Sequence, residues 1–189
     1  SAWLVSVPKA RTVTEQNFPA IADATVKQGR HAKENSGVSP VLQVLRHSNP
    51  DRNRISFIKF AVDGNREGIH RALLRLHGKR VSDYPFDDSF TLRVYGLADD
   101  TWQELDLTAE SAPGVCRTVS ATERGAITLS SPPVGHMTFT NEGGFSEIDV
   151  TSFVREHPDG ELTFLLIREL KWPGEDSDFA GVELTSREG

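Results

Sequence analysis

The sequence holds a single cysteine, Cys116, among its 189 residues, so an internal disulfide and a cysteine-based zinc site are both excluded. It has no apolar run close to the roughly 20 residues that a helix needs to cross a bilayer. Positive charge is also scarce, because 21 Lys and Arg residues stand against 27 Asp and Glu, for a formal net charge of −6 at pH 7. This balance argues against general nucleic-acid binding, which needs a basic surface overall.

The motifs of common hydrolases are missing as well. No HExxH motif, close His/Cys cluster or G-x-S-x-G nucleophile elbow is present, and Cys116 lies in no recognisable nucleophile context. We therefore expect a protein that is not an enzyme.

Short segments of alternating polar and apolar residues recur along the chain. They are 56–62, 72–79, 89–97, 136–142 and 162–170. Clusters rich in Gly, Pro, Asn and Asp separate them, as is typical of turns between strands. The pattern predicts an all-β domain of two packed antiparallel sheets over residues 20–189, with 1–19 as an N-terminal strand or the tail of a linker.

Several of these segments carry basic or hydrogen-bonding side chains opposite their apolar ones. The candidate ligand-binding residues on them are Arg75, His77, Lys79, Arg93, Tyr95 and Lys59, and Arg46 in LQVLRHS (42–48) could extend the set. In the segment 73–80 three of these side chains alternate with leucines, so they share the face that points away from the core. If the segments 73–80 and 91–97 are neighbours in one sheet, the two rows join into one surface.

Such a surface has the chemistry to bind an acidic sugar. The planar guanidinium of Arg pairs with a uronate carboxylate or a sulfate through two parallel hydrogen bonds. Lys adds a point charge, and the histidine adds charge only at mildly acidic pH. The alternative interpretation is a solvated outer sheet face, on which Lys at a strand edge discourages aggregation.

Three stretches of the sequence, taken in order, resemble a known family. They are ADATVKQGRHAKENSGVSPVLQVLRH (22–47), the run from RISFIKFAV (54–62) through ALLRLHG (72–78) to LRVYGLADDTWQE (92–104), and EIDVTSFVRE (147–156) followed by LTSRE (184–188). Together they are similar to the DNRLRE-type domain, also classed as carbohydrate-binding module family 96. The resemblance implies a jelly-roll β-sandwich that binds a polysaccharide without cleaving it. Some members are attached to polysaccharide lyases and bind alginate.

The resemblance also implies a structural calcium ion, because jelly-roll carbohydrate modules often hold one between their first and last strands. The candidate ligands are Asp23 and Asn35 on the opening stretch and Glu188 on the closing one. Calcium takes six to eight oxygen ligands, and the turn ENSGVSP could add carbonyl oxygens. Two alternatives remain: the acidic loop with Asp176 and Asp178 binds the ion, or Asp23 and Asn35 only bond their own backbone as turn formers.

We expect some aromatic residues to be buried in the core and others to lie at the edge of the ligand-binding surface. Trp102 matches a position of the family, and we expect it to pack under a turn. Trp172 lies beside a Pro-Gly turn, where an exposed indole could stack on a sugar ring or simply be buried. Tyr84 and Phe86 are candidate rim contacts.

The sequence thus predicts a carbohydrate-binding module, excised from a larger secreted or cell-surface protein that degrades polysaccharides. Its expected partners are an acidic polysaccharide such as alginate and a catalytic domain in the same polypeptide, with no nucleic acid and no membrane. One alternative is a small jelly-roll polysaccharide lyase, for which Arg75, His77, Arg93 and Tyr95 could supply a carboxylate neutraliser and an acid/base. Another is a surface adhesion module that binds protein.

Overall fold

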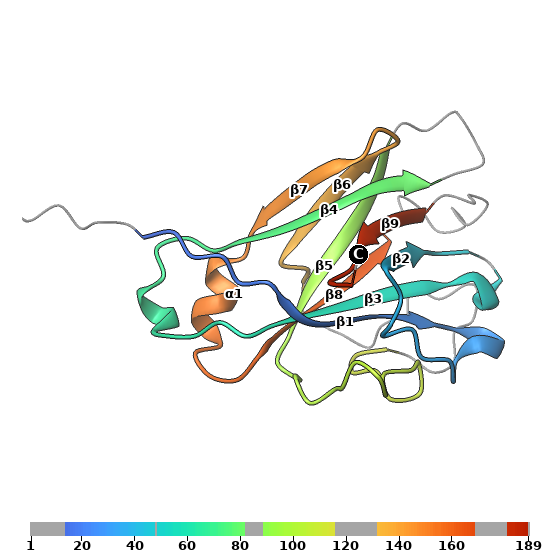
Figure 1. Ribbon diagram of the computed structural model, residues 1–189, viewed down its shortest axis with the longest axis horizontal. Helices are drawn as coiled ribbons and strands as arrows, with labels where there is room; N and C mark the ends of the chain where they lie inside the picture. The colour runs from blue at the N-terminus through green and yellow to red at the C-terminus, as the bar shows by residue number, and fades with distance from the viewer. Residues whose placement is uncertain (1–13, 48, 82–88, 116–131, 169–180, 189) are drawn as a thin grey trace, which may run out of the picture.

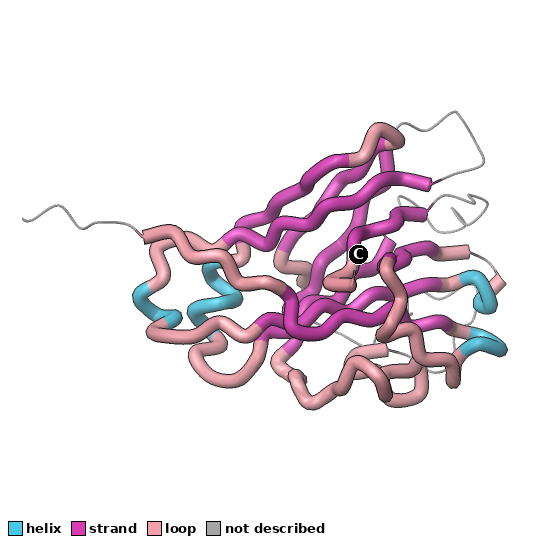
Figure 2. Tube along the Cα trace, in the orientation of Figure 1, coloured by secondary structure: helices cyan, strands magenta, loops and turns pink. Residues whose placement is uncertain are grey.

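The computed structural model describes residues 14–47, 49–81, 89–115, 132–168 and 181–188. Over these residues strands dominate (Figure 2). The strands are β1 (Ala20–Lys27), β2 (Val41–Leu45), β3 (Arg54–Phe60), β4 (Leu73–Val81), β5 (Ser89–Leu97), β6 (Gly135–Thr140), β7 (Gly144–Asp149), β8 (Leu162–Arg168) and β9 (Gly181–Thr185). The helical elements are short: the 3-10 turns η1 (Gly29–His31), η2 (Pro50–Arg52) and η3 (Arg66–Gly68), and the helix α1 (Thr151–Glu156).

All the strand pairs are antiparallel, in the order β6-β5-β8-β3-β2-β9-β4-β7, with β1 paired to β3. β2 and β3 are joined by one residue pair alone, Leu45 with Arg54. At this single pair the sheet folds into two layers, which are β1-β3-β8-β5-β6 and β2-β9-β4-β7 (Figure 1). The predicted all-β fold of the jelly-roll sandwich type is confirmed.

The main core fills the space between the layers. Alternate residues of β4, such as Leu74 and Leu76, point inward and meet Phe164 and Leu166 of β8 and Leu92 of β5, all of them at most 8% exposed. Period-two alternation therefore decides which side chains enter this core.

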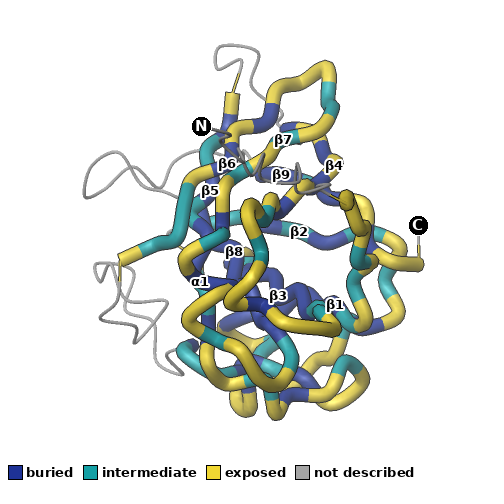
Figure 3. Tube along the Cα trace, turned by 90° about the vertical axis from the view of Figure 1, so that its left-hand side faces the viewer, coloured by how far each residue is buried: buried dark blue, intermediate teal, exposed yellow. Residues whose placement is uncertain are grey.

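A second core covers the opposite side of the five-stranded layer. The covering loop (98–115) packs Trp102 and Leu107 against Phe57 of β3, Tyr95 of β5 and Leu165 of β8. Because apolar groups lie on both faces of β3 and β8, these strands are buried almost from end to end (Figure 3).

The described part of the chain contains no helix with the length and apolar character of a membrane span, since its only α-helix, α1, has six residues.

Candidate binding face and metal site

The exposed side of the layer β2-β9-β4-β7, called here the outer face, carries the predicted row of basic residues. Along β4 the side chains of Arg75, His77 and Lys79 are exposed, while those of Leu74 and Leu76, which alternate with them, are buried. The predicted alternation of this strand is confirmed.

Phe145 of β7 completes this row, and the sequence reasoning missed it. It lies opposite His77 in the β4–β7 register and is 63% exposed. The Arg75 guanidinium lies over its ring, 4.0 Å from the centroid, and the His77 ring meets it edge-on at 4.9 Å. The available signal was the phase of β7, because Phe145 shares a strand face with Glu147 and Asp149 and so had to point outward with them.

Carboxylates balance the positive charge of the outer face. Glu147 lies opposite Arg75, with 3.1 Å between Arg75 Nε and Glu147 Oε1. Glu183 of β9 lies opposite Lys79. The outer face is therefore a mixed surface of both charges around an aromatic ring, whereas the expected surface held basic side chains and a tyrosine without carboxylates.

Lys59 and Tyr95 lie away from this surface, which corrects their expected placement. Lys59 is 3% exposed; its Nζ donates to the carbonyls of Asp100 and Trp102, both at 2.6 Å, and lies 3.0 Å from Glu161 Oε2. Tyr95 is 6% exposed and belongs to the second core. Both point toward the covering loop, which the alternation of β3 and β5 alone could not reveal.

Trp102 packs as expected beneath its turn. It is 6% exposed, its indole Nε1 donates to Thr163 Oγ1 at 3.0 Å, and its ring meets Phe57 edge-on at 5.9 Å. The Lys59 ammonium lies 4.6 Å from the ring centroid.

Arg93 and Arg46 do not join the row on β4. Arg93 is half-buried on β5, which pairs with β6 and β8, so the two basic rows lie in different layers. Arg46 follows β2 and is half-buried, and its carbonyl accepts a hydrogen bond from Arg168 Nη1 at 3.3 Å. Trp172, Tyr84, Phe86, Asp176 and Asp178 lie outside the described residues.

Two of the three expected calcium ligands come together with a third carboxylate. Asp23, Glu104 and Glu188 each offer an oxygen, and these atoms lie within 4.8 Å of one another. Asn35 instead braces the covering loop, because its Nδ2 donates to the carbonyls of Glu104 (2.7 Å) and Leu107 (3.0 Å). Glu104 is 81 residues from Asp23 in sequence, so no local spacing pointed to it.

The electrostatics of this cluster fit a cation. Asp23 is 2% exposed; its Oδ2 accepts from the Arg187 amide at 2.8 Å, while its Oδ1 has no partner among the described residues. Burial, opposed by the Arg187 amide and reinforced by Glu188 and Glu104, raises the pKa of Asp23 to about 6. A buried carboxylate oxygen without a partner is costly, and a divalent ion with oxygen ligands would satisfy it.

Arg187 neutralises part of the same cluster. Its Nε and Nη2 donate to the two carboxylate oxygens of Glu104 at 2.8 and 2.6 Å, and its Nε lies 2.9 Å from Glu188 Oε1. Burial raises the pKa of Glu104, but these bonds from Arg187 and one from the Asp23 amide bring it below its ordinary value. Asp23 is thus the carboxylate that an added cation would affect most.

Two comparisons with known proteins bear on these sites. The sequence profile of carbohydrate-binding module family 96 matches residues 14–188, nearly the whole chain. No curated protein matches the chain.

Proposed function

Because the chain belongs to carbohydrate-binding module family 96, we propose that it binds an acidic polysaccharide on its outer face and performs no catalysis there. The observation that carries this proposal is the exposed ring of Phe145, flanked by Arg75 and His77. An aromatic ring and polar side chains side by side suit a sugar, which has an apolar face of C–H groups and a rim of hydroxyls.

The acidic character of the ligand is supported by the donors that remain on this face. Arg75 is paired to Glu147 through Nε, and its side chain is still 57% exposed. Its terminal N–H groups can donate to a uronate carboxylate or a sulfate in the bidentate geometry that guanidinium favours. Lys79 lies four residues further along β4, on the same exposed face.

Calcium has a structural part in this proposal. Asp23, Glu104 and Glu188 would hold the ion, supplying carboxylate oxygens of the kind that calcium prefers. The three residues belong to β1, to the covering loop and to the segment after β9, so the ion would cross-link parts of the chain that are distant in sequence. Its contribution is stability of the fold.

The proposed setting is a secreted polysaccharide-degrading protein that the module targets to its substrate. We expect the affinity of a single module for the polysaccharide to be modest. A catalytic domain in the same polypeptide would benefit from the raised local concentration of substrate.

Affinity electrophoresis tests this function directly. The protein is run through gels containing alginate, pectin, a sulfated galactan or a neutral glucan, with calcium and with chelator. We expect retardation by an acidic glycan alone, reduced at high salt because the charged contacts are exposed. Retardation by none of these would contradict the proposal in favour of a protein-binding module, and release of unsaturated sugars would contradict it in favour of a lyase.

A further inference from the structure

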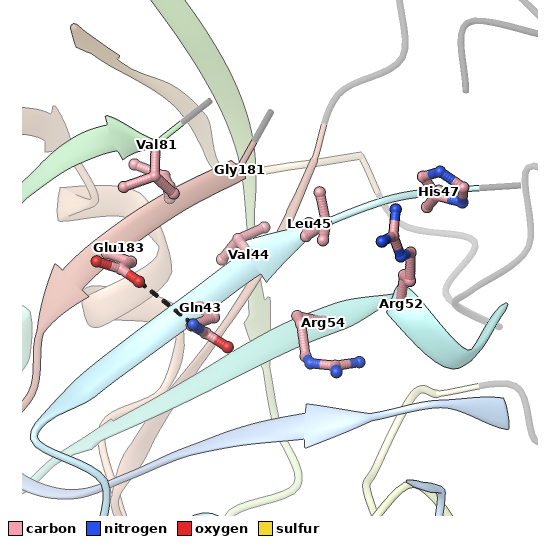
Figure 4. A pocket seen from close by; sticks show the side chains of 10 residues that line it. Gln43, Val44, Leu45, His47, Arg52, Arg54, Val81, Gly181 and Glu183 are labelled. Carbon is pink, nitrogen blue, oxygen red and sulfur yellow. Dashed lines mark hydrogen bonds between the residues drawn. The ribbon is translucent and has the colours of Figure 1, made fainter. Parts of the chain in front are cut away.

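A pocket of about 310 Å³ opens where β2, β9 and the start of β3 meet (Figure 4). Its volume is at the lower end of the range for small-molecule sites. Its lining changes character along its length: Gln43 and Glu183 lie at one end, His47, Arg52 and Arg54 at the other, with Leu45 between.

At the cationic end of the pocket, the guanidinium of Arg54 is fixed by hydrogen bonds to the backbone. Its Nη1 donates to the carbonyls of Asp51 and Asn53 at 2.9 and 2.8 Å. Among the described residues its Nε and Nη2 make no hydrogen bond, and no carboxylate pairs with it, since Asp51 is paired with Arg30 at 3.2 Å. Burial lowers the pKa of Arg54 against the pull of Glu34 and Asp51. A half-buried, oriented guanidinium with two spare donor groups is a binding group for a planar anion.

The opposite end of the pocket suits hydroxyl groups. Gln43 Nε2 donates to Glu183 Oε1 at 3.3 Å, and both side chains are half-buried. A carboxylate and an amide accept hydrogen bonds from hydroxyls, whereas the negative charge of Glu183 disfavours a second anionic group there. The lining of the pocket therefore suits a molecule with one carboxylate and several hydroxyls.

We propose that this pocket is a subsite for one uronic acid residue, with the carboxylate on Arg54 and the hydroxyls on Gln43 and Glu183. A sugar densely sulfated would meet Glu183, and a neutral sugar would leave Arg54 without a partner. The inference rests on the proposed function and deepens it. The subsite is continuous with the outer face, because Glu183 lies opposite Lys79 in the β9–β4 register.

The test uses an alginate trisaccharide as probe and cellotriose as its neutral counterpart. Nuclear magnetic resonance titration of the whole chain should shift the Gln43 side-chain amide and the backbone amides of Gly181 and Glu183 with the uronate probe alone. Arg54→Gln should weaken binding about tenfold, because a charge-assisted bidentate contact is lost. Arg155→Gln is the matched control: its guanidinium also bonds backbone carbonyls, those of Ile69 and His70, but it lies on α1 and lines no part of the pocket.

The outcomes separate this inference from the proposed function. If the wild-type protein is retarded by acidic polysaccharide while Arg54→Gln binds equally well, the subsite is overturned and the function stands. If no acidic glycan binds the wild-type protein, the proposed function fails first. Thermal unfolding of each variant checks that it is folded. The chemical-shift changes of the wild-type protein give a second test that does not depend on any variant. If the uronate probe shifts only the amides of β4 and β7, the subsite is overturned.

Discussion

Arg75 of β4 and Phe145 of β7 are diagonal neighbours across the strand pair, with the guanidinium 4.0 Å from the ring centroid. The same guanidinium reaches Glu147, so it is held between a ring and a carboxylate without being buried. A cation oriented in this way loses less side-chain entropy when it binds a ligand.

Phe145→Ala should weaken retention on acidic polysaccharide about fivefold or more, because truncating an exposed aromatic anchor removes most of its contact area. The free energy of unfolding should change by less than about 0.5 kcal/mol, as is usual for exposed positions. Affinity electrophoresis and urea unfolding measure the two quantities. Leu105→Ala is the control, because Leu105 is also 63% exposed but lies on the covering loop; equal losses for both variants would contradict a site at Phe145.

Arg75→Ala and Arg93→Ala should differ, since the two arginines lie in different layers. We expect Arg75→Ala to reduce retention and its salt dependence, because an exposed cation of the outer face is removed. Arg93→Ala should leave both nearly unchanged. Retention measured from low to high salt checks this. If only Arg93→Ala lost retention, the binding surface would lie on the five-stranded layer instead.

Asp23 should make the calcium-free protein less stable as pH rises. Its pKa is about 6 in the folded protein against an ordinary 3.8, so its stabilising contribution is complete below pH 3.8 and is lost as pH rises through 6. The loss is on the order of 3 kcal/mol. Calcium should reverse the trend, because it favours the charged carboxylate, and its stabilising effect should fade below about pH 5.

Asp23→Asn isolates this effect from the other carboxylates. In chelator at pH 7 the variant should be more stable than the wild-type protein, and in calcium the order should reverse. Thermal unfolding from pH 4 to pH 8 measures both. An equal gain from calcium in the variant and the wild-type protein would rule out Asp23 as a ligand.

Lys59→Met should destabilise the fold by about 3 kcal/mol, because it leaves the carbonyls of Asp100 and Trp102 without a donor in a buried site. Retention on polysaccharide should be unchanged in the folded variant. Urea unfolding gives the first quantity and affinity electrophoresis the second. If the Lys59→Met protein were as stable as the wild type but lost its retention on polysaccharide, Lys59 would be a ligand-binding residue and the prediction would be wrong.

The local pattern predicted the strands and the direction of their side chains, but not which strands become neighbours. The alternation around Arg75 and His77 was informative because one face of β4 is exposed. For Lys59 it failed because the covering loop buries the second face of β3. The apolar residues on both faces of this strand were the available sign that a lysine in it would be buried.

The carboxylate cluster shows the same limit. The family resemblance implied that Asp23 and Glu188 come together, because they lie on the first and last matching stretches, whose strands a calcium ion was expected to join. Glu104 comes from a loop whose position depends on the packing of Trp102 and Leu107 in the second core. The pocket at Arg54 likewise arises only where β2, β3 and β9 converge, so no single segment carries its signature.

β9 lies between β2 and β4 in its layer and is the last of the described strands in the chain. Among the described strands, β9 is the one that joins β4 to β2, because it pairs Val41 with Thr185 and Lys79 with Glu183. During synthesis one edge of β2 and one edge of β4 therefore stay unpaired until β9 has been made. Contacts of such long sequence separation form slowly. Open edges of this kind invite pairing with other chains. We expect refolding to be slow and aggregation-prone at high concentration, and a chain cut before Gly181 to lose the entire outer layer.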